Sequence, residues 1–438
     1  MAIYREPGAY SEVKVSSVLA VTPGGLRVAY LIGKGQTTYA TTALLVRASG
    51  TVDILDPTGV VISKVYPIAL YPEYSPSKYE LNGSGNLEWL DTTGIPAEGD
   101  QFYIDYTYNK TSADYIPKEF TTMEAVIAEY GPVSTSNPLS IGAQLVFENG
   151  ASIVGAVQVQ VTGNDYTDFE DALNKLEIVD DASIIVPLYA SSTFGTSVLK
   201  SHVSRMSSKV ERKERVGLTG LDETLEAIST ASWISLAGAL GSNRMGLVYP
   251  GKMNKILDEG EVVLDGTFLA AAIAGMMTSA EFDSAEPLTH KDLFGIVDVG
   301  ISVLNVVKNQ LATAGVMIVD KRGITPYIRH GLTTDMTTIS GQEMSVTTSI
   351  DEVVKNLRKV LEGAYVGTKF LATLPSQVSM TMQTNLLQAI EDELITAFTD
   401  LQVKRNAIDP RAVDIKVKVM PVFPCNWLDI EMTLVPIV

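Results

Sequence analysis

Val413-Asp-Ile-Lys-Val-Lys-Val-Met420 alternates apolar with charged residues, which is the period of a half-buried β-strand. The apolar face of this stretch consists of Val413, Ile415, Val417 and Val419. After two prolines, a second alternating stretch places three apolar residues on one face, namely Ile430, Met432 and Leu434. The end of the chain therefore predicts two exposed strands.

The beginning of the chain has the same character, because Val13 and Val15 alternate with Glu12, Lys14 and Ser16. A strand of about seven residues that buries three apolar side chains gains roughly 5–9 kcal/mol. Ordering its backbone costs roughly 7–14 kcal/mol. Such a strand needs a sheet edge to pair with, either in its own domain or in a neighbouring copy of the chain. The pattern alone leaves both possibilities open.

The composition excludes several classes of function. The chain has 438 residues, enough for two to four domains, and a formal net charge of −18. This acidity argues against binding to nucleic acid or to an anionic membrane. The longest apolar run, Phe268–Met277, has about half the length of a membrane span. One cysteine and three histidines exclude an internal disulfide and leave little for metal sites. We expect a soluble protein, made in a cytoplasm, without direct membrane insertion.

Short strands separated by turn residues predict a small all-β domain between residues 43 and 115. Its clearest turns are Asp56-Pro-Thr-Gly59 and Asn82-Gly-Ser-Gly-Asn86. Further on, strands that begin at Ile184, Val216 and Met245 recur about thirty residues apart, the length of a β-α-β unit. Residues 116–290 are therefore expected to form an α/β domain with a parallel sheet.

Helical patterns fill most of the remaining chain. The expected helices are Thr196–Lys213, Asp222–Leu240, Gly300–Ala314, Ile350–Leu361 and Val378–Leu401. Arg405–Arg411 is the expected linker to the final strands.

No catalytic constellation is recognisable. Gly33-Lys-Gly35 lacks the spacing of a phosphate-binding loop, and nucleophile elbows, His-Glu-x-x-His and Cys-x-x-Cys motifs are absent. An acidic cluster lacks the spacing of a calcium loop: Asp165, Asp168, Glu170 and Asp171. One helix is basic, through Lys200, Arg205, Lys209, Arg212, Lys213 and Arg215. We expect a solvated helix face there, with an electrostatic docking patch as the alternative. No enzyme activity, cofactor or metal is expected.

Short motifs with a common likeness are spread over most of the chain. They are Pro7–Tyr10, Tyr79–Leu90, Pro96–Tyr108, Asp114–Phe120, Glu148–Ser152, Arg244–Pro250 and Gly315–Tyr327. Together they resemble segments of the contractile tail sheath proteins of bacteriophages and related contractile injection systems. None of these motifs is a catalytic fingerprint.

The resemblance implies a multidomain fold of the α/β and α+β classes, with a sheath core domain built from both chain ends. A small all-β domain and an α/β domain would be inserted into that core. The implied division is an N-terminal arm (1–25), the start of the core or a connector (26–42), the β domain (43–115), the α/β domain (116–290), the C-terminal core domain (291–411) and the C-terminal strands and arm (412–438).

The resemblance also implies a function. The chain would be a structural subunit that forms stacked hexameric rings around an inner tube, and contraction would drive the tube through the target envelope. Expected partners are other copies of the chain, the inner tail tube protein, and baseplate and tail terminator proteins. The expected location is a virion tail or a contractile injection particle, assembled in the host cytoplasm. Strand exchange between subunits is expected at Val13, Val15, Ile415, Val417, Val419, Ile430, Met432 and Leu434.

Two other functions remain open at this stage. One is a soluble α/β enzyme whose active site is too dispersed to be recognised in a sequence. The other is a subunit of a tube or fibre that does not contract. The size of the purified protein separates the first from a sheath, because an enzyme stops at a small closed oligomer while a sheath polymerises.

Overall fold

The computed structural model describes residues 27–69, 72–300 and 303–432. Its centre is an eight-stranded sheet in the order β16-β15-β12-β11-β10-β1-β9-β8. These strands span Val28–Gly33 (β1), Lys118–Phe120 (β8), Val154–Gln158 (β9), Ala182–Pro187 (β10), Val216–Thr219 (β11), Met245–Tyr249 (β12), Val316–Arg322 (β15) and Thr325–Ile328 (β16). The six inner strands run parallel, and the two edge strands are antiparallel to their neighbours.

Helices cover both faces of this sheet, which explains why its strands are continuous apolar runs. In β1, Ala29 and Leu31 face one core while Val28, Tyr30 and Ile32 face the other. The first core is covered by α1 (Met123–Tyr130), α2 (Pro138–Glu148) and α7 (Thr267–Met277). The second is covered by α3 (Asp165–Lys175), α5 (Lys200–Met206), α6 (Thr230–Leu240) and α8 (Asn305–Thr313). The sheet is therefore a rigid central layer.

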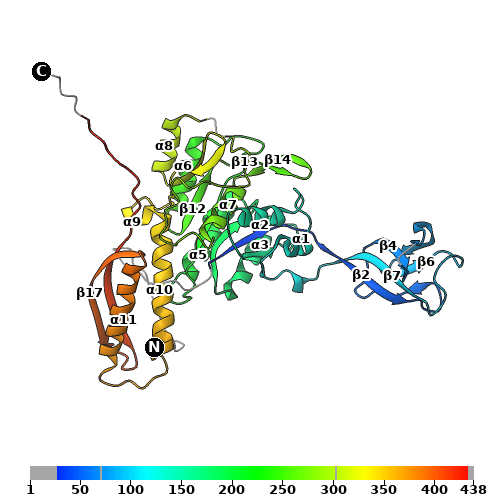
Figure 1. Ribbon diagram of the computed structural model, residues 1–438, viewed down its shortest axis with the longest axis horizontal. Helices are drawn as coiled ribbons and strands as arrows, with labels where there is room; N and C mark the ends of the chain where they lie inside the picture. The colour runs from blue at the N-terminus through cyan, green and yellow to red at the C-terminus, as the bar shows by residue number, and fades with distance from the viewer. Residues whose placement is uncertain (1–26, 70–71, 301–302, 433–438) are drawn as a thin grey trace.

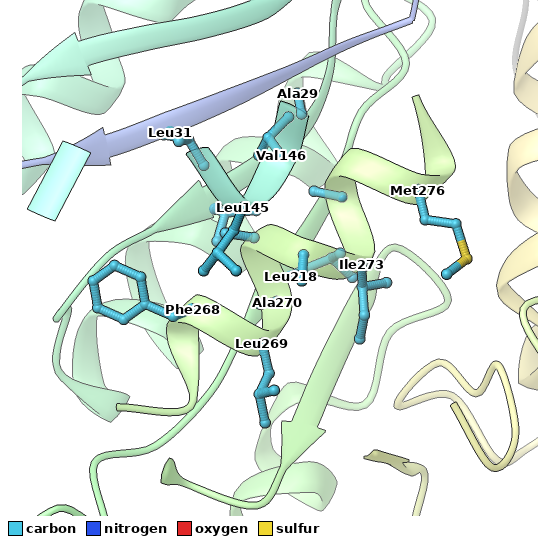
Figure 2. Close-up of a cluster of buried hydrophobic side chains, with 14 of the residues drawn as sticks. Ala29, Leu31, Leu145, Val146, Leu218, Phe268, Leu269, Ala270, Ile273 and Met276 are labelled. Atoms are coloured by element: carbon cyan, nitrogen blue, oxygen red, sulfur yellow. The ribbon is translucent and has the colours of Figure 1, made fainter. Parts of the chain in front are cut away.

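Helix α7 is buried on all sides. Figure 2 shows Phe268, Ile273 and Met276 of this helix packed among side chains of the sheet and of α2. The closest approach is at Gly275, where a Cβ atom would lie 2.4 Å from the carbonyl oxygen of Val146. Glycine at this position lets the backbones of α2 and α7 come together.

The β insertion projects from one end of the molecule in Figure 1. One three-stranded sheet contains β2 (Thr38–Val46), β7 (Gln101–Asn109) and β4 (Val61–Pro67). The other contains β3 (Val52–Asp53), β6 (Leu87–Trp89) and β5 (Tyr79–Leu81). The two sheets share an aromatic core around Trp89. Both connections to the central sheet pass through β1–β2 and β7–β8, so the domain is an insertion between two sheet strands.

A carboxylate fixes the base of this insertion. Glu129 of α1 lies 2.9 Å from Lys118 and 3.1 Å from Lys110, and it accepts a hydrogen bond of 2.6 Å from the Tyr39 hydroxyl. Lys110 also donates to Gln158. Because the Lys110 ammonium is fully buried, its pairing is needed for the joint to form.

The C-terminal module lies at the opposite end of the molecule (Figure 1). It consists of α10 (Met344–Tyr365), α11 (Leu374–Glu391) and a hairpin of β17 (Ile395–Arg405) and β18 (Val413–Pro421). A short helix α9 (Ile339–Gln342) precedes it, and a second hairpin, β13 (Lys252–Leu257) with β14 (Gly260–Asp265), follows β12.

Several sequence-based expectations are wrong in detail. The helix expected at Thr196–Lys213 ends at Met206. The helix expected at Val378–Leu401 ends at Glu391, and its remainder is β17, which is rich in β-branched and aromatic residues. The expected linker Arg405–Arg411 is the loop that joins β17 to β18. The helix expected from Asp222 begins at Thr230, because Ser229 accepts the capping hydrogen bond from the Ser232 N–H.

The expected mixed α/β and α+β multidomain class is confirmed. The central sheet, however, extends beyond the expected limit at residue 290, because β15 pairs in parallel with β12. Strand β1, within the expected connector at 26–42, is central to the same sheet. The proposed N-terminal arm lies outside the described residues.

Candidate assembly interface

The hairpin of the C-terminal module is a sheet of only two strands. Strands β17 and β18 pair with each other from Ile395–Pro421 to Arg405–Val413, with a register shift between Thr399 and Gln402. Within the described part of the chain, neither strand pairs with a third. Each strand therefore presents an outer edge whose N–H and C=O groups have no strand partner. Such edges are templates for strand addition.

Helix packing holds this hairpin in shape. Val419 is 2% exposed and lies in a core with Met382 and Leu386 of α11 and Val353 of α10. Ile415 and Val417 are half-buried against the same core. An isolated two-stranded hairpin is marginally stable in water, so α10 and α11 are what keep its two edges straight and available.

The expected exchange residues fall into three groups. Ile415, Val417 and Val419 belong to the chain's own hairpin, where Val403 is the partner of Ile415 and Phe398 that of Val419. Their side chains pack internally, so they shape an accepting edge rather than a donated arm. Ile430 and Met432 are 82% and 86% exposed. Val13, Val15 and Leu434 lie outside the described residues.

The C-terminal tail leaves the hairpin after Pro421 and passes the start of α10 before it extends into solvent (Figure 1). Between residues 422 and 432 its backbone makes no hydrogen bond to the described body. Asn426 is its polar attachment: the side-chain Nδ2 donates to Glu343 Oε1 at 2.8 Å and lies 3.1 Å from His330 Nε2. Its Oδ1 accepts a hydrogen bond of 3.3 Å from Thr289.

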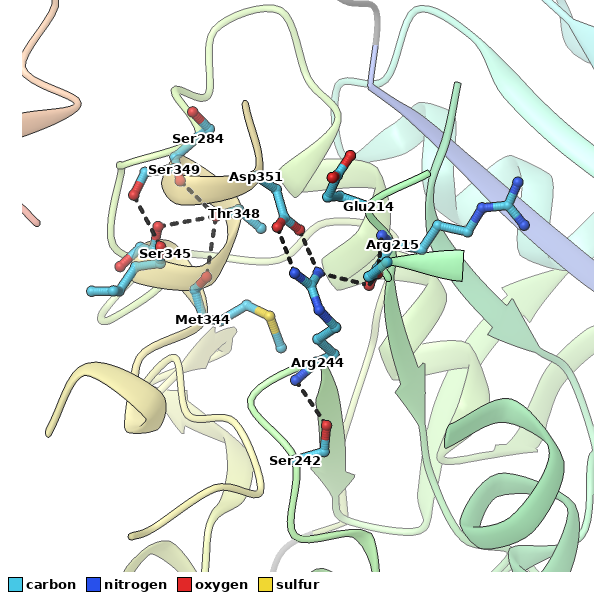
Figure 3. A network of polar contacts seen from close by, with 12 residues as sticks. Glu214, Arg215, Ser242, Arg244, Ser284, Met344, Ser345, Thr348, Ser349 and Asp351 are labelled. Carbon is cyan, nitrogen blue, oxygen red and sulfur yellow. Dashed lines mark hydrogen bonds and ion pairs between the residues drawn. The ribbon is translucent and has the colours of Figure 1, made fainter. Parts of the chain in front are cut away.

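Ion pairs attach α10 to the central sheet domain. Figure 3 shows Arg244, just before β12, with its two terminal guanidinium nitrogens, Nη1 and Nη2, donating hydrogen bonds of 2.6 and 2.7 Å to the carboxylate of Asp351. Two turns further along α10, Arg358 pairs with Glu214, and one turn beyond it Glu362 lies 2.7 Å from Arg212. Asp351 is buried, and burial raises the pKa of its carboxyl while Arg244 opposes that shift. The pairs lie along one face of α10 and join the C-terminal module to the sheet.

Most of the basic residues that were expected on one helix lie beyond it, because α5 ends at Met206. Arg205 pairs with Glu177, Lys213 with Asp180, and Lys200 donates to the Ala239 carbonyl. Arg215 is fully buried and contacts His202. Arg205 is exposed, as the expected solvated face requires, whereas Arg215 is buried and fits neither a solvated face nor a docking patch.

The acidic cluster is also structural. Asp168 accepts hydrogen bonds from the backbone and hydroxyl of Thr162, and these bonds lower the pKa of its carboxyl. Asp165 pairs with Lys34 at 2.9 Å. Among the described residues, no three histidine, cysteine or acidic side chains come together in a way that would hold a metal ion. A search of the same residues finds no helix long and apolar enough to cross a membrane.

Sequence reasoning missed the contacts that define this region. Asn426, His330 and Glu343 lie far apart in the chain, and Arg244 is remote from Asp351. No spacing rule connects them. The only available signal was that acids and bases recur on α10 at helical intervals, at Asp351, Lys355, Arg358 and Glu362.

A curated relative is named as a tail sheath protein. No family model matches the chain. The tail sheath protein of Mycobacterium phage Bxz1 is 26% identical over 352 residues, which cover 77% of this chain. The chain spans 59% of the length of that relative.

Solved sheath structures share the fold. The contracted helical sheath of the anti-feeding prophage matches with a TM-score of 0.62 at 12% identity, over 98% of this chain and 99% of that one. The contracted PVC sheath complex, from an extracellular contractile injection system, matches with a TM-score of 0.58 at 11% identity, over 99% and 98%. The sheath tail protein of Listeria innocua matches with a TM-score of 0.51 at 15% identity, over 92% and 94%.

The resemblance predicted from short motifs is thereby confirmed: the chain has the fold of contractile sheath proteins and is similar in sequence to a phage tail sheath protein.

Proposed function

We propose that the chain is a structural subunit of a contractile tail sheath, which polymerises as stacked rings around an inner tube and contracts to drive the tube through a target envelope. The observation that carries the proposal is the hairpin of β17 and β18, a two-stranded sheet whose outer edges lack a strand partner in the described chain. The exposed apolar side chains of the C-terminal tail supply a matching strand.

Strand exchange explains both features together. The tail alternates exposed Leu428, Ile430 and Met432 with acidic residues, so its apolar face is in solvent in the single chain. On the edge of a neighbouring hairpin, this face would be buried and each backbone hydrogen bond would add about 0.5–1.5 kcal/mol. Repetition over many subunits makes the array strong although each link is modest. The N-terminal arm is proposed to pair with the second edge.

Contraction would move folded bodies between two packings of the array. The central sheet domain and the C-terminal module are joined by the ion pairs of α10, so they are proposed to move together. The hairpin loop at 405–411 holds its strands in register and is not a suitable hinge. The connector would instead be the tail itself. The energy is stored in the extended array, and no catalytic activity is proposed.

The remaining assignments rest on the relatives. One structural match is the anti-feeding prophage baseplate, with a TM-score of 0.62 at 12% identity. We propose the inner tube, the baseplate and the tail terminator as partners and a virion tail or injection particle as the location. The domain division derived from the resemblance, with the sheet limits given above, stays a proposal.

Electron microscopy of the purified full-length chain tests this function. A sheath subunit is expected to form long tubes or stacked rings, while sedimentation to a small closed oligomer at all concentrations would rule the function out. A variant lacking Asp429–Val438 is expected to remain monomeric, because it lacks the donated strand. Long tubes formed by this variant would refute strand exchange through the C-terminal tail.

A further inference from the structure

We infer that Asn426 is a positioning residue that fixes where, and in which direction, the C-terminal arm leaves the subunit. The inference rests on the proposed function, in which that arm pairs with a neighbouring copy. It adds a specific attachment point, formed by Thr289, His330 and Glu343, that separates a held part of the tail from a free part.

The attachment has the features of a specific contact. Glu343 is buried at the start of α10, and its Oε1 is 2.8 Å from Asn426 Nδ2 and 2.8 Å from His330 Nε2. Thr289 donates to the other end of the same amide. The Asn426 amide therefore donates to Glu343 and accepts from Thr289, which lie on separate segments of the body. His330 Nε2 lies 2.8 Å from the same Glu343 oxygen, where its N–H orients that carboxylate.

The neighbouring residue reinforces the contact. The Trp427 ring meets the His330 imidazole edge to face, with centroids 5.9 Å apart and planes at 90°. Trp427 is nevertheless 77% exposed. Beyond Trp427 every described residue is exposed. The last point of attachment of the described tail is thus the pair Asn426–Trp427.

The position of this point limits the reach of the arm. Residues 427–432, fully extended, reach about 20 Å from the attachment. Without it the free segment begins after Pro421, and residues 422–432 reach about 36 Å. Effective concentration falls with about the −3/2 power of tether length, so the longer tether dilutes the tip about 2.5-fold. The direction of the arm is then no longer set. The attachment therefore presents the arm to one neighbour.

The single cysteine offers a direct probe. Cys425 is exposed and adjacent to Asn426, so a nitroxide label on it reports tail motion in the full-length protein without any introduced cysteine. The label is expected to be slow in the wild type and severalfold faster in Asn426→Ala. Asn426→Asp, an isosteric change, places a carboxylate against Glu343 and is expected to release the tail as well. Glu226→Ala, at an exposed residue of the central sheet domain and without a hydrogen bond or ion pair in the described chain, is the control outside the tail.

Assembly is measured on the unlabelled proteins by pelleting. Both Asn426 variants are expected to raise the critical concentration at least about twofold while their thermal melting stays that of the wild type. Glu226→Ala is expected to change neither quantity. A label that moves as freely in the wild type as in Asn426→Ala would overturn the attachment. Released tails with unchanged critical concentrations would overturn the positioning role and leave the proposed function intact. If the wild type never polymerises while its label is held, the proposed function fails and the positioning role with it.

Discussion

The buried pair of His202 and Arg215 predicts a specific loss of stability in mild acid. His202 is 3% exposed, and its Nε2 lies 2.8 Å from the Arg215 guanidinium. A guanidinium can only donate, so Nε2 must accept and the imidazole must be neutral. Burial, with the nearby positive charge of Arg215 as a second cause, lowers the pKa of His202 from 6.5 to about 3.

The size and sign follow from proton linkage. Between pH 6.5 and about 3 the unfolded chain binds a proton at His202 that the folded chain does not, so the free energy of unfolding falls as the pH falls through this window. At pH 5 the loss is about 2 kcal/mol. Above pH 6.5 the protonation of His202 no longer lowers the free energy of unfolding, and below about pH 3 the loss that it causes stays constant.

The loss is measured by urea unfolding of the wild type and of His202→Gln at pH 7.5 and pH 5.0. The protein concentration is kept low enough for the chain to stay monomeric. Glutamine keeps a neutral acceptor and takes up no proton. Acidic residues elsewhere affect both proteins equally, so the difference between them isolates His202. The wild type is expected to lose about 2 kcal/mol more than the variant between the two pH values. Equal losses would show that His202 is not held neutral by Arg215.

Two further pairs of substitutions test an ion pair of α10 and the packing of the central domain. Arg244→Met leaves the buried Asp351 carboxylate without its guanidinium partner and is expected to lower the free energy of unfolding by about 3–5 kcal/mol. Adding Asp351→Leu should recover most of this loss. If urea unfolding shows that the two substitutions lower the free energy of unfolding additively, the two residues do not act as a pair. Gly275→Ala should destabilise the chain by at least about 1 kcal/mol, because the added Cβ meets the Val146 backbone. Gly238→Ala has no atom within 4 Å of the added Cβ and should stabilise α6 by about 0.5–1 kcal/mol. Similar melting temperatures for both alanine variants would contradict the close contact of α2 with α7.

Local pattern was sufficient for the regular part of the fold. The strands at Ile184, Val216 and Met245 were predictable because a buried parallel strand is a continuous apolar run, and the thirty-residue interval reflects one crossover helix. Val413–Met420 was predictable because one of its faces packs on α11 and the other meets solvent. In both cases the periodicity records burial directly.

The same reasoning failed where two periodicities overlap or where contacts are long-range. The spacing of Leu386, Ile390 and Leu394 continues a helical face, so the change to β17 after Glu391 was hidden. Pairing of Asn426 with Glu343 and of Arg244 with Asp351 depends on the tertiary fold, which brings together residues that share no local pattern. The candidate interface was therefore predictable in its strands and unpredictable in its attachments.

Cross-linking across mixed assemblies tests the exchange of the C-terminal strand most directly. The light chain carries Ile430→Cys. The isotopically heavy chain carries either Lys418→Cys on β18 or Thr399→Cys on β17. Both chains also carry Cys425→Ser, and light and heavy chains are mixed before polymerisation. Exchange of the C-terminal strand predicts a disulfide between a light and a heavy peptide at one of the two hairpin edges. If neither edge forms such a link, while a chain carrying both cysteines links only to itself, the tail folds back onto its own subunit and the proposed mechanism is wrong.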